Sequence, residues 1–223
     1  MRRVDSTPSR PENLAARLRQ AFLDHGYEQM TMSGLAHLCG FSRRALYHHF
    51  SNKEEAFRYW LEFYNHESIA MGIAAGRAAM EAGSGAVDVL VETMNVRYGD
   101  ARRRLARSPH ALEVNDQAFR RSRDIIIAVA IDFQAKVVGL LKELEARRQI
   151  SLKPGVTFEA LSQTLCDGAR GTNQAVPPIP IDDLHLRYRQ IIEAILFGAA
   201  SPPTTPRGGG AKGSGKIGSR ATK

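Results

Sequence analysis

One short segment of the chain concentrates side chains that could bind nucleic acid. Arg43 and Arg44 follow Ser42 directly, and Tyr47 and His48 come one helical turn later. A guanidinium can donate two hydrogen bonds to guanine O6 and N7, which are exposed in the major groove of DNA. Hydroxyl and ammonium groups bind phosphate oxygens and fix the register of a protein on the duplex. Nearby groups of this second kind are Thr31, Ser33, Tyr47 and Lys53.

The apolar residues around this segment predict the elements that position it. Their spacing indicates two short helices joined by a turn at Gly40, where a positive φ can be required, and Ser42 is a suitable N-cap for the second helix. The predicted inner faces consist of Leu35, Ala36, Cys39, Phe41, Leu46 and Phe50. This layout is that of a helix-turn-helix with Arg43 and Arg44 on its outer face, although spacing alone also fits a structural piece of a helical bundle.

Helical periodicity continues to residue 199, so the sequence predicts an all-α fold. A first helix of about four turns follows Pro11 and ends at Gly26. A long fourth helix is expected to start at Asn52, with Gly72 and Gly76 marking a possible bend and the Gly83-Ser84-Gly85 segment an end. Further helices are predicted at about 86–107, 116–148, 157–174 and 183–198.

The residues in and around the helix-turn-helix resemble the N-terminal signature of the TetR family of bacterial transcriptional regulators. Two positions depart from that signature, because Arg44 stands where the family usually has Gly and Cys39 where it often has Ala. The base-reading surface is therefore expected to be bulkier, and an operator preference does not transfer. The matching positions cover roughly residues 11–60 and are Phe22, Gly26, Tyr27, Thr31, Leu35, Ala36, Gly40, Phe41, Ser42, Leu46, Tyr47, His49, Phe50, Lys53 and Glu54.

The resemblance implies an all-helical homodimer that binds double-stranded DNA at a palindromic operator and carries a ligand pocket in each C-terminal domain. Repression relieved by a small-molecule effector is the expected outcome, with the fourth helix as the lever between domains. The expected organisation is a flexible arm at 1–10, a helix-turn-helix domain at 11–59, a ligand-binding and dimerisation domain at 60–200 and a disordered basic tail at 201–223. The residues expected to contact DNA are Thr31, Ser33, Ser42, Arg43, Arg44, Tyr47, His48 and Lys53.

Charge and composition agree with a protein of which one part meets a polyanion. The chain of 223 residues has 31 Lys and Arg against 23 Asp and Glu, a formal net charge of +8. The excess lies at the two ends, since residues 60–200 hold equal numbers of each sign. Two separate cysteines, Cys39 and Cys166, argue against a disulfide framework or a structural zinc site and favour a cytoplasmic location. The most apolar run, 125–141, is too short and too polar to span a bilayer.

Ligand-binding and dimerisation residues are predicted more loosely, because aromatic and Met side chains at helical spacing are more often plain core. The dimer is expected through the last two helices, by stripes containing Phe158, Leu161 and Leu165 and then Leu184, Tyr188, Ile191, Ile195 and Leu196, with burial inside one chain as the alternative. The candidate pocket residues are Trp60, Tyr64, Met94, Asn95, Tyr98, His110, Asn115, Phe119 and Phe133.

Several other patterns receive ordinary interpretations. The arginines at 102–107 and 120–123 are expected to form a solvated face. The sharper alternatives are an entrance for an anion or an acyl-carrier-type ligand, or a surface near the DNA backbone. Adjacent helical residues point about 100° apart, so His48 and His49 are not expected to share a metal ion. The Gly/Lys-rich segment 210–216 matches most of a phosphate-binding loop but lacks its strand, helix and final Ser or Thr. No catalytic set stands out, so neither an enzyme nor a cofactor is expected. The main alternative function is a protein-interaction module or a nonspecific DNA organiser.

Overall fold

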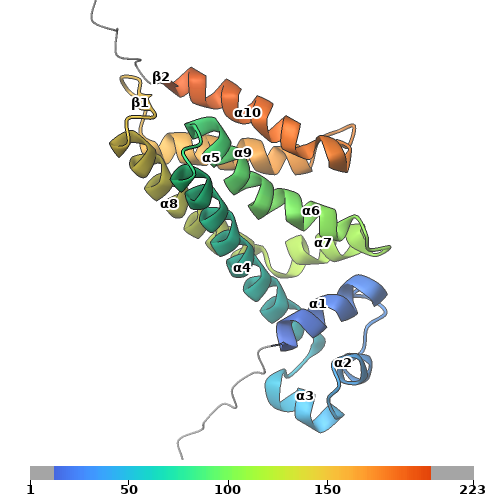
Figure 1. Cartoon of the computed structure of the whole chain (residues 1–223). Coiled ribbons are helices and arrows are strands. Elements are labelled where there is room, and N and C mark those ends of the chain that lie inside the picture. Colours follow the sequence, from blue (N-terminus) through green and yellow to red (C-terminus); the bar gives the residue numbers. More distant parts are fainter. Residues whose placement is uncertain (1–12, 202–223) are drawn as a thin grey trace, which may run out of the picture.

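The computed structural model describes residues 13–201, which are almost entirely helical, as predicted. Three short helices form a head at one end of the molecule, and a long helix connects this head to a larger helical body (Figure 1). The head contains α1 (Leu14–His25), α2 (Met32–Leu38) and α3 (Arg43–His49). The connecting helix is α4 (Lys53–Glu81). The body contains α5 (Ala86–Met94), the π-helical turn η1 (Asn95–Gly99), α6 (Asp100–Leu105), α7 (Ala111–Arg121), α8 (Arg123–Ala146), α9 (Phe158–Asn173), the 3₁₀ turn η2 (Ile181–Asp183) and α10 (Leu184–Ala199).

Local signals in the sequence set the boundaries of the head helices. The side chains of Thr31, Ser42 and Asn52 each accept a hydrogen bond from the backbone N–H three residues later, which caps α2, α3 and α4. Gly26 ends α1 at a φ of 75°, and Gly40 makes the turn before α3 at a φ of 70°. Both glycines occupy the backbone region that side chains rarely adopt, which confirms the predicted turn at Gly40.

The head core is built around aromatic side chains that α1 and α4 share. The Phe57 ring packs against the rings of Phe22, Tyr27 and Trp60, with ring centroids 5.0, 5.0 and 5.2 Å away. Edge-on aromatic pairs of this kind add attraction beyond the burial of their area. Because Phe57 and Trp60 belong to the first turns of α4, the head is packed rigidly onto the helix that enters the body. The same cluster includes Val114 of α7.

Helix α4 is continuous from Lys53 to Glu81, so Gly72 and Gly76, where the sequence suggested a bend, do not break it. A Cβ atom on Gly72 would lie 2.9 Å from the carbonyl oxygen of Thr93, and one on Gly76 would overlap the Thr93 side chain. These glycines therefore allow α4 to approach α5 and η1 closely.

The predicted helix at 116–148 is also wrong, because the chain breaks it at Ser122. Ser122 has φ −136° and ψ 30°, outside the helical region, and separates α7 from α8. The break lets α7 lie beside the head while α8 crosses the body (Figure 1). A further departure from regular α-helix is η1, which carries Arg97 and Tyr98 in a π-helical turn.

Helices α9 and α10 pack against each other and against α8 and α5 in the body core. Leu161, Leu165, Leu184, Tyr188 and Leu196 from the predicted dimer stripes are buried in the core of their own chain. Two short strands, β1 (Ser151–Leu152) and β2 (Ala200–Ser201), pair antiparallel beside them.

Within residues 13–201, no helix is long and apolar enough to cross a membrane. The predicted N-terminal arm, and the basic tail from residue 202 onward with its phosphate-loop-like segment, lie outside the described residues.

Candidate functional sites

The outer face of α3 presents its polar side chains to solvent. Arg43, Arg44, Tyr47 and His48 are all exposed, whereas Leu46 is completely buried in the head core. Within residues 13–201, no carboxylate forms an ion pair with either of the two guanidiniums. Their hydrogen-bond donors can therefore bind a ligand without first breaking an internal salt bridge.

Contacts on its inner side hold α3 in place. Leu46 and Phe50 pack into the core, and the Phe41 ring lies 5.7 Å from that of His49. Nη1 of Arg17 on α1 donates a 2.7 Å hydrogen bond to the Cys39 carbonyl at the turn. A rigid support of this kind reduces the entropy lost when the exposed face binds a partner.

The remaining predicted DNA contacts fall into two groups. Thr31, Ser33 and Ser42 are exposed, and the hydroxyls of Thr31 and Ser42 also cap their helices. Lys53 is different, because its ammonium donates to the carbonyls of Tyr27 at 2.9 Å and Glu28 at 3.3 Å. Lys53 therefore ties the α1–α2 loop to the start of α4, in addition to any contact with phosphate.

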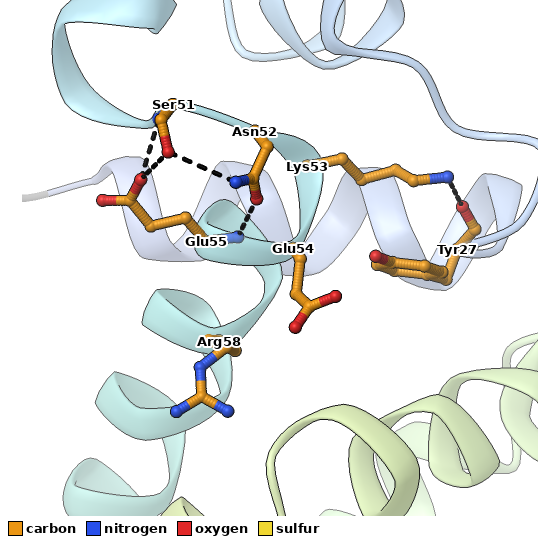
Figure 2. A pocket seen from close by; sticks show the side chains of 7 residues that line it. All are labelled: Tyr27, Ser51, Asn52, Lys53, Glu54, Glu55 and Arg58. Atoms are coloured by element: carbon orange, nitrogen blue, oxygen red, sulfur yellow. Dashed lines mark hydrogen bonds between the residues drawn. The ribbon is translucent and has the colours of Figure 1, made fainter.

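Figure 2 shows the start of α4, where a shallow surface hollow is lined by residues of the α3–α4 turn. Asn52 Oδ1 accepts a hydrogen bond from the Glu55 N–H, and Glu55 Oε2 accepts from both the N–H and the hydroxyl of Ser51, all at 2.8 Å. Arg58, on the next turn of α4, binds Asp124 at the start of α8. The polar groups of the turn form hydrogen bonds with each other, and the pair of Arg58 and Asp124 links the start of α4 to the body.

A second cavity, of about 510 Å³, lies inside the body among α4, η1, α6, α7, α8 and α9. Four of the nine predicted pocket residues line it: Tyr64, Tyr98, Asn115 and Phe119. The other five lie elsewhere. Trp60 belongs to the head core, Met94 and Phe133 are buried in the body core, Asn95 accepts a hydrogen bond from Arg103, and His110 pairs with Glu113.

Sequence reasoning passed over the most unusual residue of the cavity, Arg97. Its side chain is only 7% exposed, and its guanidinium donates to Ser68 Oγ and Asn65 Oδ1, both at 2.8 Å. Burial lowers the pKa of Arg97 from its usual value, but a guanidinium stays protonated in proteins. The signal available in the sequence was a charged residue placed between apolar helical positions.

The arginines predicted to form a solvated face divide into two groups, because Arg107, Arg120 and Arg123 are exposed whereas those at 102–104 are partly buried. Arg102 donates to the carbonyls of Asn173 at 2.7 Å and Ile179 at 3.0 Å and lines the cavity. Arg103 binds Asp100, and Arg104 stacks 5.4 Å from the Tyr64 ring centroid. Most of the group at 102–104 therefore stabilises the body.

Helix α7 contacts the head on one side and the cavity on the other. Glu113 Oε1 accepts hydrogen bonds from the backbone N–H groups of Tyr27 at 2.8 Å and Glu28 at 2.6 Å, and Gln117 Nε2 donates to Glu28 Oε1 at 2.6 Å. The cavity side of α7 carries Asn115 and Phe119. A displacement of α7 would therefore reach the head directly, beside the route through α4.

His48 and His49 do not form a metal site, since His49 packs against Phe41 while His48 is exposed. Among the residues that the structure describes, no group of three or more His, Cys, Asp or Glu side chains could hold a metal ion.

Comparisons with known proteins agree with this geometry. A family model described as bacterial regulatory proteins, tetR family, matches residues 15–59 and confirms the resemblance seen in the sequence. No curated protein matches the chain.

Solved structures share the fold over most of the chain. A TetR transcription regulator from Haloarcula marismortui is 15% identical, with a TM-score of 0.62 and coverage of 85% of this chain and 97% of that one. SmeT, the repressor of the Stenotrophomonas maltophilia multidrug efflux pump SmeDEF, is 15% identical, with a TM-score of 0.57 and coverage of 89% and 96%. The fatty acid degradation regulator FadR from Bacillus halodurans is 18% identical, with a TM-score of 0.58 and coverage of 86% and 98%.

Proposed function

We propose that this chain, whose residues 15–59 match the model of the tetR family of bacterial regulatory proteins, is a homodimeric repressor of that family, which a small molecule in the body cavity releases from a palindromic operator. The observation that carries this proposal is the exposed row of Arg43, Arg44, Tyr47 and His48 on a rigidly supported α3. A helix of this kind fits the major groove, with arginines on guanine edges and Tyr47 near the phosphates. Repression is also the activity stated for the fold relative SmeT.

The exposed sides of the last two helices support the homodimer. Most of their apolar stripes pack inside the chain. Small residues are exposed on both helices, namely Ala160, Thr164 and Gly171 on α9 and Ala194 and Gly198 on α10, next to the exposed Asp167 and Arg187. Small side chains permit close approach of helices, and an antiparallel pair from each chain can form a four-helix bundle. Phe197, 49% exposed on α10, adds apolar area to this face.

The effector would act by a population shift. A ligand that binds best when α7 or α4 is displaced stabilises dimers whose heads are wrongly spaced for two half-sites. Its effect on DNA affinity equals its differential affinity for the two arrangements. The hydrogen bonds between Glu113 and the α1–α2 loop are the contacts through which α7 would move the head.

Selection of operator fragments from random DNA by the purified full chain tests this function. We expect a palindrome whose half-sites are about one helical turn or a multiple of it apart, with affinity that falls steeply as salt rises. Arg77→Gln is a matched control for the loss of an arginine on α3, because Arg77 is also exposed but binds Glu143 on the body. Binding without sequence preference would contradict the proposal and favour the nonspecific DNA organiser.

The same selection with a chain ending at residue 201 separates these two functions. An operator-specific repressor keeps its sequence choice without the basic tail, whereas an organiser that depends on the tail loses most of its DNA binding.

A further inference from the structure

We propose that the cavity binds an organic anion, with a carboxylate held at Arg97 and an apolar body enclosed by α7 and α8. This inference rests on the proposed regulatory function and names the chemical class of its effector. It starts from the charges of the cavity wall, which includes Arg97, Arg102 and Arg170 but no Asp or Glu among the described residues.

Arg97 supplies the strongest part of the argument, because its charge is buried without a counter-ion. Its hydrogen-bond acceptors, Ser68 Oγ and Asn65 Oδ1, are both neutral, and Nε is buried without a partner. Taking a guanidinium out of water costs several kcal/mol unless an opposite charge compensates. Arg97 also lines the cavity, so its uncompensated positive charge lies next to a space that an anion could occupy.

The surroundings of Arg97 fix its direction and exclude an internal acid as its partner. The guanidinium carbon lies 5.0 Å from the Tyr98 ring centroid and 5.7 Å from that of Phe133, so two aromatic rings orient it. The groups that act electrostatically on Arg97 are Tyr98, Tyr64, Arg170 and Cys166, and none of them is a carboxylate. Arg97 also belongs to the π-helical turn η1, a local distortion often found at functional sites.

The two other arginines of the wall, Arg102 and Arg170, already have other polar partners. Arg102 binds backbone carbonyls after α9, and Arg170 lies 3.5 Å from Asp167 in an exposed pair. They make the local potential more positive, and Arg97 is the group left to bind the anion directly.

The rest of the wall is suited to an apolar body. The lining also includes apolar side chains such as Leu105, Ala118, Phe119, Ile126 and Val129. A volume of about 510 Å³ lies within the usual range for small-molecule sites. An anion with no apolar part would leave these surfaces in contact with water, so we expect phosphate or acetate to bind weakly.

Binding to the full chain in the absence of DNA tests the inference. The probes are decanoate and naphthalene-2-carboxylate, each compared with its primary amide, and inorganic phosphate and acetate as anions without an apolar body. We expect at least one of the two carboxylates to bind at least about tenfold more tightly than its amide and to raise the melting temperature, because only the carboxylate forms charge-assisted hydrogen bonds with a guanidinium.

Substitution of Arg97 locates the effect. In Arg97→Met, carboxylate and amide should bind equally, while the control Arg77→Met keeps the difference. The carboxylate and amide comparison on the unmodified chain needs no variant, so it remains decisive if Arg97→Met folds poorly. Equal binding of both pairs, no binding of either carboxylate, or an unchanged preference in Arg97→Met would overturn the inference. These outcomes do not depend on operator selection, which is the separate experiment that tests the proposed function.

Discussion

Among the described residues, α3 and the body both contain arginines without a carboxylate partner, but the two regions differ in how far these side chains are exposed to water. On α3, Arg43 and Arg44 are exposed, so water solvates their charge. In the body, Arg97 is 7% exposed and lies between Tyr98 and Phe133. An exposed unpaired guanidinium costs almost nothing, whereas a buried one lowers the stability of the fold. The first can bind DNA without breaking an internal ion pair, and the second, under our proposal, exchanges stability for affinity towards a ligand.

The difference also separates two kinds of recognition. The α3 face is exposed and could exchange its water for base edges and phosphates, so we expect its binding to depend strongly on salt. Arg97 is buried, and low local polarity would strengthen a hydrogen bond from its guanidinium to an anion. Loss of the arginines is therefore expected to change operator affinity in one region and stability in the other.

The largest expected effect is on DNA. Arg43→Ala and Arg44→Ala should each cost about 1–3 kcal/mol of operator affinity and relax the preference at one base pair, because each removes a bidentate contact with a guanine. Their effect on the free energy of unfolding should stay within about 0.5 kcal/mol, since both side chains are exposed. Titration of operator and scrambled DNA measures the first quantity, and urea unfolding the second. Intact discrimination in the double variant would show that another surface reads the bases.

Loss of the buried Arg97 should affect stability more than operator affinity. Arg97→Met replaces an uncompensated buried charge with an apolar side chain of similar length, which removes a desolvation cost of several kcal/mol. We therefore expect the ligand-free chain to resist urea at least as well as the parent, at one fixed protein concentration, while operator affinity without ligand changes little. Arg77→Met, with its exposed pair to Glu143, is the control. A loss above about 1 kcal/mol would show that the bonds to Ser68 and Asn65 outweigh the buried charge.

The head could be predicted from the sequence almost residue by residue because its signals are local. Caps at Ser42 and Asn52 and the glycine turn at Gly40 each depend on a few neighbouring residues. The alternation of buried and exposed residues along α3 likewise follows from helical spacing alone, and it placed Arg43 and Arg44 outside. That the exposed arginines contact DNA bases stays a prediction.

The body was less predictable because its features depend on packing between distant segments. Ser122 reads like an ordinary helical serine, and only the contact of α7 with the head explains the break there. Phe133 and Phe119 have the same chemical character in the sequence, but one fills the core and the other lines the cavity. Arg97 was passed over, because its position between apolar helical residues does not by itself reveal the α4 and α8 side chains that bury it.

Helix α7 gives a way to uncouple the two regions. Hydrogen bonds from the Glu28 and Tyr27 N–H groups, together with His110, hold the pKa of Glu113 below its ordinary value of 4.5. A carboxylate whose pKa is lowered by folding contributes stability above its unfolded pKa, and that contribution is lost as the pH falls through the folded value. The contact between α7 and the head should therefore hold at neutral pH and weaken progressively below pH 4.5.

Glu113→Ala should remove this contact at every pH. We expect faster hydrogen exchange at the amides of Tyr27 and Glu28 and a loss of about 1 kcal/mol of stability, because two N–H groups lose their acceptor. Glu113→Gln keeps an acceptor oxygen without the charge, so it should retain much of the exchange protection and show a weaker dependence of stability on acidic pH. Unchanged exchange in Glu113→Ala would mean that the head is held by α4 alone.

The smallest expected effect is a difference in the rates at which the buried cysteines of the head core and the body core are modified. Burial raises the pKa of Cys39 in the head to about 11 and that of Cys166 in the body to about 12, although Arg17 and Arg170 oppose the shift. At pH 8 neither native thiol should react quickly with a disulfide reagent, since the thiolate is the nucleophile and both side chains are buried. Slow reaction should come from local opening, and the head core contains fewer buried residues than the body core. We therefore expect Cys39 to be modified before Cys166, as identified by mass spectrometry of quenched samples. Modification of Cys166 first would show that the body around the cavity opens more readily than the head.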